Sequence, residues 1–129
     1  MQPKAIVLVV EDEPQLLQVL CLAIKQLGHD FRTAADGATA VCVARKTEPN
    51  LILMDVDLPD CSGFNLCWAL KQSPELASVP VVFCTGRDTP EDRRAAIQAG
   101  AADYLVKPFS LSEFAECLRR NLSSPQAQA

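Results

Sequence analysis

Hydrophobic and polar positions alternate along the chain in two patterns. Short runs of apolar, often β-branched residues are separated by longer stretches in which apolar residues recur three and four apart. Runs that are apolar throughout are typical of strands covered on both faces. The runs predict strands at residues 5–10, 31–35, 51–54, 80–84 and 103–106.

The longer stretches carry helix start and stop signals. We predict helices that begin at or just after Pro14, Asp36, Ser62, Thr89 and Ser110. The clearest start is the last one, because Ser110 and Glu113 fit a capping box, and Phe109 and Phe114 hold the two hydrophobic-staple positions. Five strands that alternate with five helices predict an α/β fold, a doubly wound parallel sheet with helices on both faces in three layers.

Composition adds limits to this picture. With 129 residues and 49% hydrophobic residues, the chain fits one globular domain. A net charge of -4 argues against general binding to nucleic acid or to an anionic membrane. The apolar run at 5–10 is too short for a membrane span and lacks the pattern of a signal peptide, so we expect a cytoplasmic protein.

The six cysteines form no C-x-x-C pair, and most lie in apolar stretches. We therefore expect buried, reduced thiols rather than disulfides. The sequence assigns no role to Cys61 or Cys84.

Acidic residues follow two of the predicted strands. Glu11 and Asp12 come after the first, and Asp55 comes after the third. If these strands are neighbours, the three carboxylates converge, and two charges about 5 Å apart repel by roughly 3 kcal/mol at an effective dielectric near 20. A cation is therefore expected, and oxygen donors favour Mg²⁺ or Mn²⁺. Lys107 and Thr85 follow other strands and reach the same edge.

Other strand-end and loop acids have a simpler interpretation. Glu13, Asp60 and Asp88 fit helix caps or solvated loop charges.

In these features the chain resembles the receiver domains of two-component response regulators from about residue 4 to residue 122. The resemblance rests on Glu11-Asp12, the segment 51–59 with Gly63, Thr85-Gly86 and the segment 102–109. It implies the strand order 2-1-3-4-5. It also implies a receiver domain over 1–122, with 123–129 as a flexible tail or the start of a linker.

The resemblance assigns a role to each site residue. Asp55 would take a phosphoryl group from a phosphohistidine on a sensor histidine kinase or a histidine phosphotransfer protein. The metal would be held by Asp55, by Asp12 directly, by Glu11 through water and by the backbone carbonyl of Asp57. The chain would then be a switch that catalyses its own phosphorylation and dephosphorylation, rather than a turnover enzyme.

Other residues would report and tune this state. Lys107 and Thr85 would contact the phosphoryl oxygens, and in the family the bond that corresponds to Lys107-Pro108 is commonly cis. Tyr104 resembles the aromatic switch that turns inward as Thr85 moves. Gly86 stands where alanine is usual, which would loosen this loop.

Two loop residues have opposite charges at facing positions of the site. We predict an ion pair between Asp57 and Arg87 that shields the phosphoryl group from water.

The output would be a change in the face made by the fourth helix, the fifth strand and the fifth helix. That face would bind a downstream protein, an output domain absent from this chain or a second copy of it.

Three alternatives use the same residues differently. Asp55-Val-Asp57 also fits the start of the D-x-D motif of haloacid-dehalogenase-type phosphatases, although Pro59 departs from that motif. A flavin or nucleotide binder would share the fold, yet no glycine-rich loop follows the first strand. A receiver that acts as a scaffold without phosphorylation is the third alternative.

Overall fold

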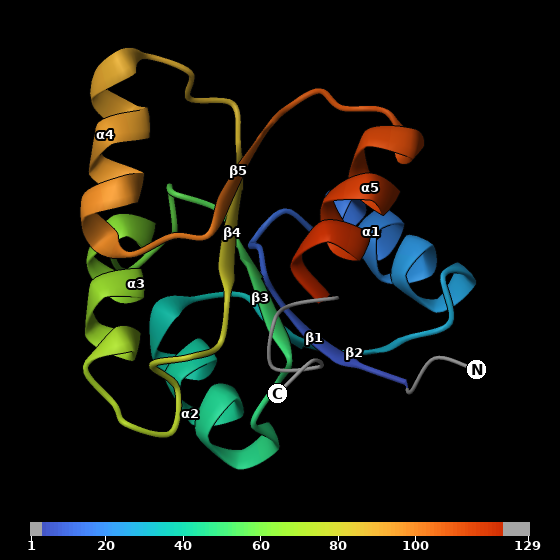
Figure 1. Ribbon diagram of the computed structural model, residues 1–129, viewed down its shortest axis with the longest axis horizontal. Coiled ribbons are helices and arrows are strands. Elements are labelled where there is room, and N and C mark those ends of the chain that lie inside the picture. The colour runs from blue at the N-terminus through green and yellow to red at the C-terminus, as the bar shows by residue number, and fades with distance from the viewer. Residues whose placement is uncertain (1–3, 123–129) are drawn as a thin grey trace.

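The computed structural model describes residues 4–122, in which strands and helices alternate from end to end (Figure 1). The elements are β1 (Ile6–Val10), α1 (Pro14–Gln26), β2 (Asp30–Ala34), α2 (Gly37–Thr47), β3 (Leu51–Met54), α3 (Gly63–Lys71), β4 (Val81–Thr85), α4 (Pro90–Ala99), β5 (Asp103–Val106) and α5 (Leu111–Leu122). Each predicted strand is present, and its ends lie within one residue of the prediction. The expected tail at 123–129 lies outside the described residues.

The sheet is parallel, with the order β2-β1-β3-β4-β5, which confirms the predicted fold. Figure 1 shows α2, α3 and α4 on one face and α1 and α5 on the other. The order reverses between β1 and β3, so the carboxyl ends of these two strands flank the crevice where ligands bind in such sheets.

Two hydrophobic cores lie on the two faces of the sheet. Alternate strand residues point to opposite faces, so Ile52 and Phe83 pack under α2, α3 and α4, while Val9 and Leu53 pack under α1 and α5. All four side chains are buried. The continuous apolar runs of the sequence are therefore explained by helices on both faces.

Capping fixes the starts of the last two helices. Ser110 and Glu113 exchange side-chain to backbone hydrogen bonds of 3.0 and 2.8 Å, as predicted. The rings of Phe109 and Phe114 stack with centroids 5.8 Å apart, which completes the staple. Thr89 forms a second capping box with Asp92 at the start of α4.

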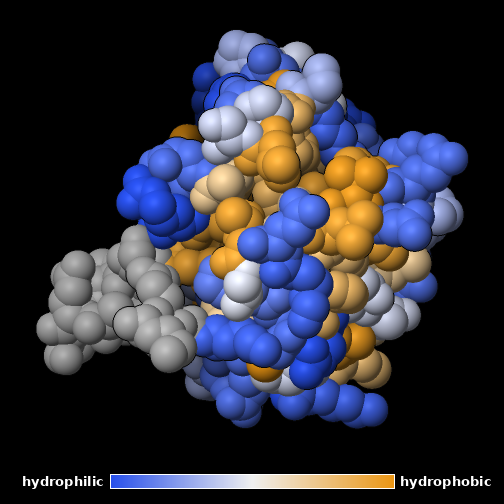
Figure 2. Space-filling model, turned by 90° about the vertical axis from the view of Figure 1, so that its right-hand side faces the viewer, coloured by the Kyte–Doolittle hydropathy of each residue, from blue (hydrophilic) through white to orange (hydrophobic). Residues whose placement is uncertain are grey.

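Figure 2 views the molecule from the side of α1 and α5, where apolar side chains lie exposed among charged ones. Val19 and Leu22 of α1 are exposed, whereas Leu20 and Ile24 of the same helix are buried. Among the described helices, none is long and apolar enough to cross a membrane.

The cysteines follow the prediction only in part. All six are free thiols, and Cys21, Cys67, Cys84 and Cys117 are buried. Cys61 is half-buried and Cys42 is exposed, so the expectation of burial is wrong for Cys42, which lies on the solvent side of α2. Burial raises the pKa of Cys67 and of Cys117 to about 11, so both thiols stay protonated at neutral pH.

Candidate functional site

Three carboxylates meet at the carboxyl ends of β1 and β3. Val10 and Met54 are partners in the register, and the Asp55 amide donates to the Val10 carbonyl at 3.1 Å. Glu11, Asp12 and Asp55 therefore leave the sheet at the same edge. One carboxylate oxygen from each lies within 4.8 Å of the others, which confirms the predicted convergence.

The three carboxylates differ in exposure. Glu11 is 3% exposed and Asp55 is 9% exposed, while Asp12 faces solvent. Burial raises the pKa of Glu11, although a hydrogen bond from the Glu13 amide and the charge of Lys107 oppose this. The Glu11 amide donates to the Ala34 carbonyl at 3.0 Å, which ties this end of β1 to the end of β2.

Lys107 brings a positive charge into the cluster. Its Nζ lies 3.2 Å from Glu11 Oε1 and 3.4 Å from Asp55 Oδ2. Burial alone would lower the pKa of Lys107, but the two carboxylates outweigh it and raise the pKa, so the amine stays charged. One lysine cannot neutralise three carboxylates, and an all-oxygen donor set of this size suits a hard divalent cation.

Thr85 ends β4 beside this cluster. It is buried, and its Oγ1 accepts a hydrogen bond from the Arg87 amide at 3.3 Å. The Lys107 amide donates to the Thr85 carbonyl at 2.8 Å, so the ends of β4 and β5 are joined. The Lys107-Pro108 peptide bond is cis.

The predicted ion pair between Asp57 and Arg87 is present. Arg87 Nη2 lies 2.7 Å from Asp57 Oδ1, and Nε lies 3.0 Å from Oδ2. The hydrogen bond and the charge of Arg87 hold the pKa of Asp57 below its usual range. Arg87 also reaches Asp92 at 3.6 Å, so it connects the β3–α3 loop to the first turn of α4.

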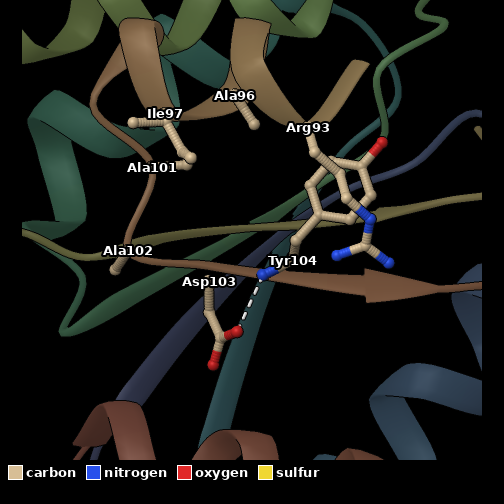
Figure 3. A pocket seen from close by; sticks show the side chains of 7 residues that line it. All are labelled: Arg93, Ala96, Ile97, Ala101, Ala102, Asp103 and Tyr104. Carbon is tan, nitrogen blue, oxygen red and sulfur yellow. Dashed lines mark hydrogen bonds between the residues drawn. The ribbon is translucent and has the colours of Figure 1, made fainter. Parts of the chain in front are cut away.

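Tyr104 is half-buried on β5. Its hydroxyl donates to the Arg87 carbonyl at 2.7 Å, and the Arg93 guanidinium lies 4.9 Å from the centre of its ring. Figure 3 shows Tyr104 and Arg93 at one end of a hollow of about 230 Å³ between α4 and β5. Ile97, which is 74% exposed, lines the same hollow. The predicted output face therefore has an apolar depression beside the predicted switch residue.

One contact of the loop after β3 is not predicted by the sequence. The sequence predicts a helix cap or a solvated loop charge at Asp60, and its carboxylate does bind the start of a helix, α2, although the N-cap of that helix is Asp36. The Asp60 carboxylate accepts hydrogen bonds from the Gly37 and Ala38 amides at the start of α2, at 2.7 and 3.1 Å. No sequence signal indicates this pairing, because the partners are backbone amides that every residue except proline has.

Residues 7–119 match the family described as "Response regulator receiver domain", and the chain therefore belongs to this family. The match favours the receiver over the phosphatase and flavin-binding alternatives. Among solved structures, the chemotaxis response regulator CheY4 of Vibrio cholerae is 30% identical, with a TM-score of 0.88 over 93% of this chain and 100% of that chain.

Two further relatives bear on the site and on the whole protein. The receiver domain of the sensor histidine kinase PA1611 from Pseudomonas aeruginosa has a magnesium ion coordinated in its active site cleft. It is 32% identical, with a TM-score of 0.87 over 95% of this chain and 100% of that chain. The probable transcriptional regulatory protein TcrX of Mycobacterium tuberculosis is 41% identical over 88% of this chain and 47% of its own length. The chain spans about half the length of the curated relatives it matches.

Proposed function

We propose that this receiver domain takes a phosphoryl group onto Asp55 from a phosphohistidine of a sensor histidine kinase or a histidine phosphotransfer protein. The observation that carries the proposal is the place of Asp55. It is a largely buried carboxylate at the switch point of the sheet, within 4.8 Å of two other acids and 3.4 Å from Lys107. A cluster that gathers negative charge around one lysine is suited to binding a cation and then an anion.

The transfer is a displacement at phosphorus. A carboxylate oxygen of Asp55 forms the new bond to phosphorus as the nitrogen–phosphorus bond breaks. The electron pair of the broken bond stays on that ring nitrogen, and because the other ring nitrogen of the phosphohistidine carries a proton, the imidazole leaves as neutral histidine. Lys107 neutralises the charge that collects on the phosphoryl oxygens. Thr85 supplies a hydroxyl at the end of β4 that can donate to one of them.

Glu11, Asp12, Asp55 and the backbone carbonyl of Asp57 would hold Mg²⁺, and Mn²⁺ could replace it. The donor set fits this ion because it contains only oxygen and combines buried with exposed carboxylates. When bound, the ion supplies charge that lets one anion approach another. The protein residues then hold Asp55 in place and exclude bulk water from its buried side.

The output follows from the contacts of Tyr104 and Arg87. A phosphoryl group on Asp55 would draw the hydroxyl of Thr85, whose Oγ1 accepts from the Arg87 amide. The Arg87 carbonyl in turn accepts a hydrogen bond from the Tyr104 hydroxyl. We infer that the face of α4, β5 and α5 passes this change to a downstream protein, an attached output domain or a second copy. We place the reaction in the cytoplasm, as expected from the sequence.

Intact-mass spectrometry tests the proposal most directly. The protein is incubated with Mg²⁺ and acetyl phosphate, beside an Asp55→Asn variant and a chelator control. We expect one added phosphoryl group of about 80 Da that requires both Mg²⁺ and Asp55. If the folded protein binds Mg²⁺ but gains no phosphoryl group from either acetyl phosphate or a phosphorylated histidine domain, the scaffold alternative is correct instead.

A further inference from the structure

The loop between β3 and α3, residues 56–62, folds back tightly on itself. The Gly63 amide donates to the Val56 carbonyl at 2.7 Å, and Asp57 and Ser62 form an antiparallel bridge. A Cβ on Gly63 would lie 2.3 Å from the Asp55 carbonyl oxygen. The two ends of the loop therefore come so close that any residue with a side chain at position 63 would clash. The conformation of this loop therefore decides where Asp57 sits relative to Asp55.

The far end of this loop is attached to α2. The Asp60 carboxylate accepts from the Gly37 amide with Oδ1 and from the Ala38 amide with Oδ2. A Cβ on Gly37 would lie 2.5 Å from Cys61 Sγ and 3.2 Å from Asp60 Oδ1. Glycine at the first position of α2 therefore lets the loop approach the helix backbone directly.

Asp60 is not the N-cap of this helix. That position belongs to Asp36, whose carboxylate accepts from the Thr39 amide at 2.8 Å. Two carboxylates thus share the free amides of one helix end, but only Asp60 comes from another part of the chain. Its contact bridges 22 to 23 residues of sequence.

Both sides of the carboxylate cluster are attached to the same junction between β2 and α2. On one side the Glu11 amide donates to Ala34, the last residue of β2. On the other side Asp60 is bound by the first two residues of α2. The junction contains only residues 35 and 36. It therefore sets the distance between the β1 end of the cluster and the loop that carries Asp57.

We propose that Asp60 is a positioning residue for the cation site: its bonds to the start of α2 hold the 56–62 loop and thereby fix where Asp57 lies relative to Glu11, Asp12 and Asp55. This inference rests on the proposed function, which gives the Asp57 carbonyl a place among the metal ligands. Asp60 itself contacts neither the cation nor the phosphoryl group.

The test compares Asp60→Ala with Asp36→Ala in the full chain, and calorimetric titration with MgCl₂ measures the dissociation constant for Mg²⁺. Each change removes one carboxylate from the same helix end, so both should lower the unfolding midpoint. Only Asp60→Ala should weaken Mg²⁺ binding, by about tenfold, the usual cost of losing an outer-shell support. Asp60→Asn keeps one acceptor oxygen, so it should bind Mg²⁺ with an affinity between those of Asp60→Ala and the unmodified protein. This variant replaces Asp60→Ala in the test if Asp60→Ala does not fold.

Amide hydrogen exchange gives a second readout that needs no metal. In Asp60→Ala, amides of residues 56–63 should exchange faster, while Asp36→Ala should leave them at the rate of the unmodified protein.

The inference is overturned if Asp60→Ala or Asp60→Asn binds Mg²⁺ as tightly as the unmodified protein, or if Asp36→Ala weakens binding equally. A different result marks failure of the proposed function. If the unmodified folded protein binds no Mg²⁺, the cation site is absent, and the role of Asp60 is lost with it.

Discussion

Arg87 binds the carboxylate of Asp57 with both Nε and Nη2, at distances from 2.7 to 3.1 Å, and so joins the loop after β3 to the loop after β4. Both side chains are exposed, at 48% and 61%, so solvent screens the pair and it adds little to stability. We propose that this pair limits the access of water to a phosphoryl group on Asp55 rather than stabilising the fold.

We therefore predict that Arg87→Ala shortens the lifetime of the phosphorylated protein severalfold, while the free energy of unfolding stays close to that of the unmodified protein. The lifetime is measured by intact-mass spectrometry after the phosphodonor is removed. Arg119→Ala is the matched control, because Arg119 is also exposed and paired with an acid, Glu116, but lies on α5. Loss of phosphate at the wild-type rate in Arg87→Ala would contradict the shielding role.

A second prediction concerns Lys107, whose Nζ contacts both Glu11 and Asp55. Lys107→Ala leaves these carboxylates without a cation, so it should lower the free energy of unfolding by about 1–3 kcal/mol in the absence of metal. Mg²⁺ should restore more stability to this variant than to the unmodified protein, because it supplies the missing charge. Urea unfolding with and without Mg²⁺ measures the difference.

Lys71→Ala is the control for this effect. Lys71 is also half-buried, but its Nζ donates to the carbonyls of Ala77 and Val79 rather than to acids. Its loss should destabilise the protein by an amount that Mg²⁺ does not change. Equal rescue of both lysine variants by Mg²⁺ would show that the cation does not compensate for Lys107.

Much of this site could be predicted from the sequence, because its residues lie at the ends of strands or directly after them. A buried strand ends where its apolar run ends, so Glu11 and Asp55 had to lie at one edge once β1 and β3 were neighbours. Asp57 and Arg87 could be paired because opposite charges on facing loops attract. In each case the residue types themselves carry the information.

Contacts to the backbone could not be predicted in this way. Asp60 binds two amides of α2, and amides are present at nearly every residue, so the side chains do not mark the partner. The position of Tyr104 depends on the carbonyl of Arg87 in the same way. The exposure of Cys42 is not predicted by the sequence, because its apolar neighbours do not reveal which side of α2 meets solvent.

The third prediction is a pH dependence at Asp103, on the output face. Burial raises the pKa of Asp103, but hydrogen bonds from Asn121 and Arg120 outweigh burial and bring the pKa below its usual value. Asp103 Oδ2 accepts from Arg120 Nε at 3.0 Å and from Asn121 Nδ2 at 2.9 Å, and Cys117 Sγ lies at 3.8 Å. Because the folded-state pKa is lowered, the ionised carboxylate stabilises the fold above the unfolded value of about 3.9, and this contribution is lost as the pH falls through the lower folded value.

Asp103→Asn should therefore lower the free energy of unfolding by about 1–2 kcal/mol at pH 7. The loss stays this small because the charge-assisted bond from Arg120 is half-exposed and screened by solvent. The difference from the unmodified protein should shrink as the pH falls below about 4. Urea unfolding at several pH values measures this difference. Asn121→Ala should reduce the same pH dependence, and a gap that stays constant down to pH 3 would contradict the assignment.

The last prediction separates two glycines of the active-site loops. Gly63→Ala would place a Cβ 2.3 Å from the Asp55 carbonyl oxygen and 2.9 Å from Val56 Cα, and both are backbone atoms that cannot turn away. The free energy of unfolding should fall by about 1–3 kcal/mol.

A Cβ on Gly86 meets nothing within 4 Å, and the φ angle of Gly86 lies outside the left-handed region. Gly86→Ala should therefore stabilise the protein by about 0.4–1 kcal/mol, because alanine restricts the unfolded chain. Equal effects of the two changes in urea unfolding would mean that the close approach at Gly63 does not hold the loop.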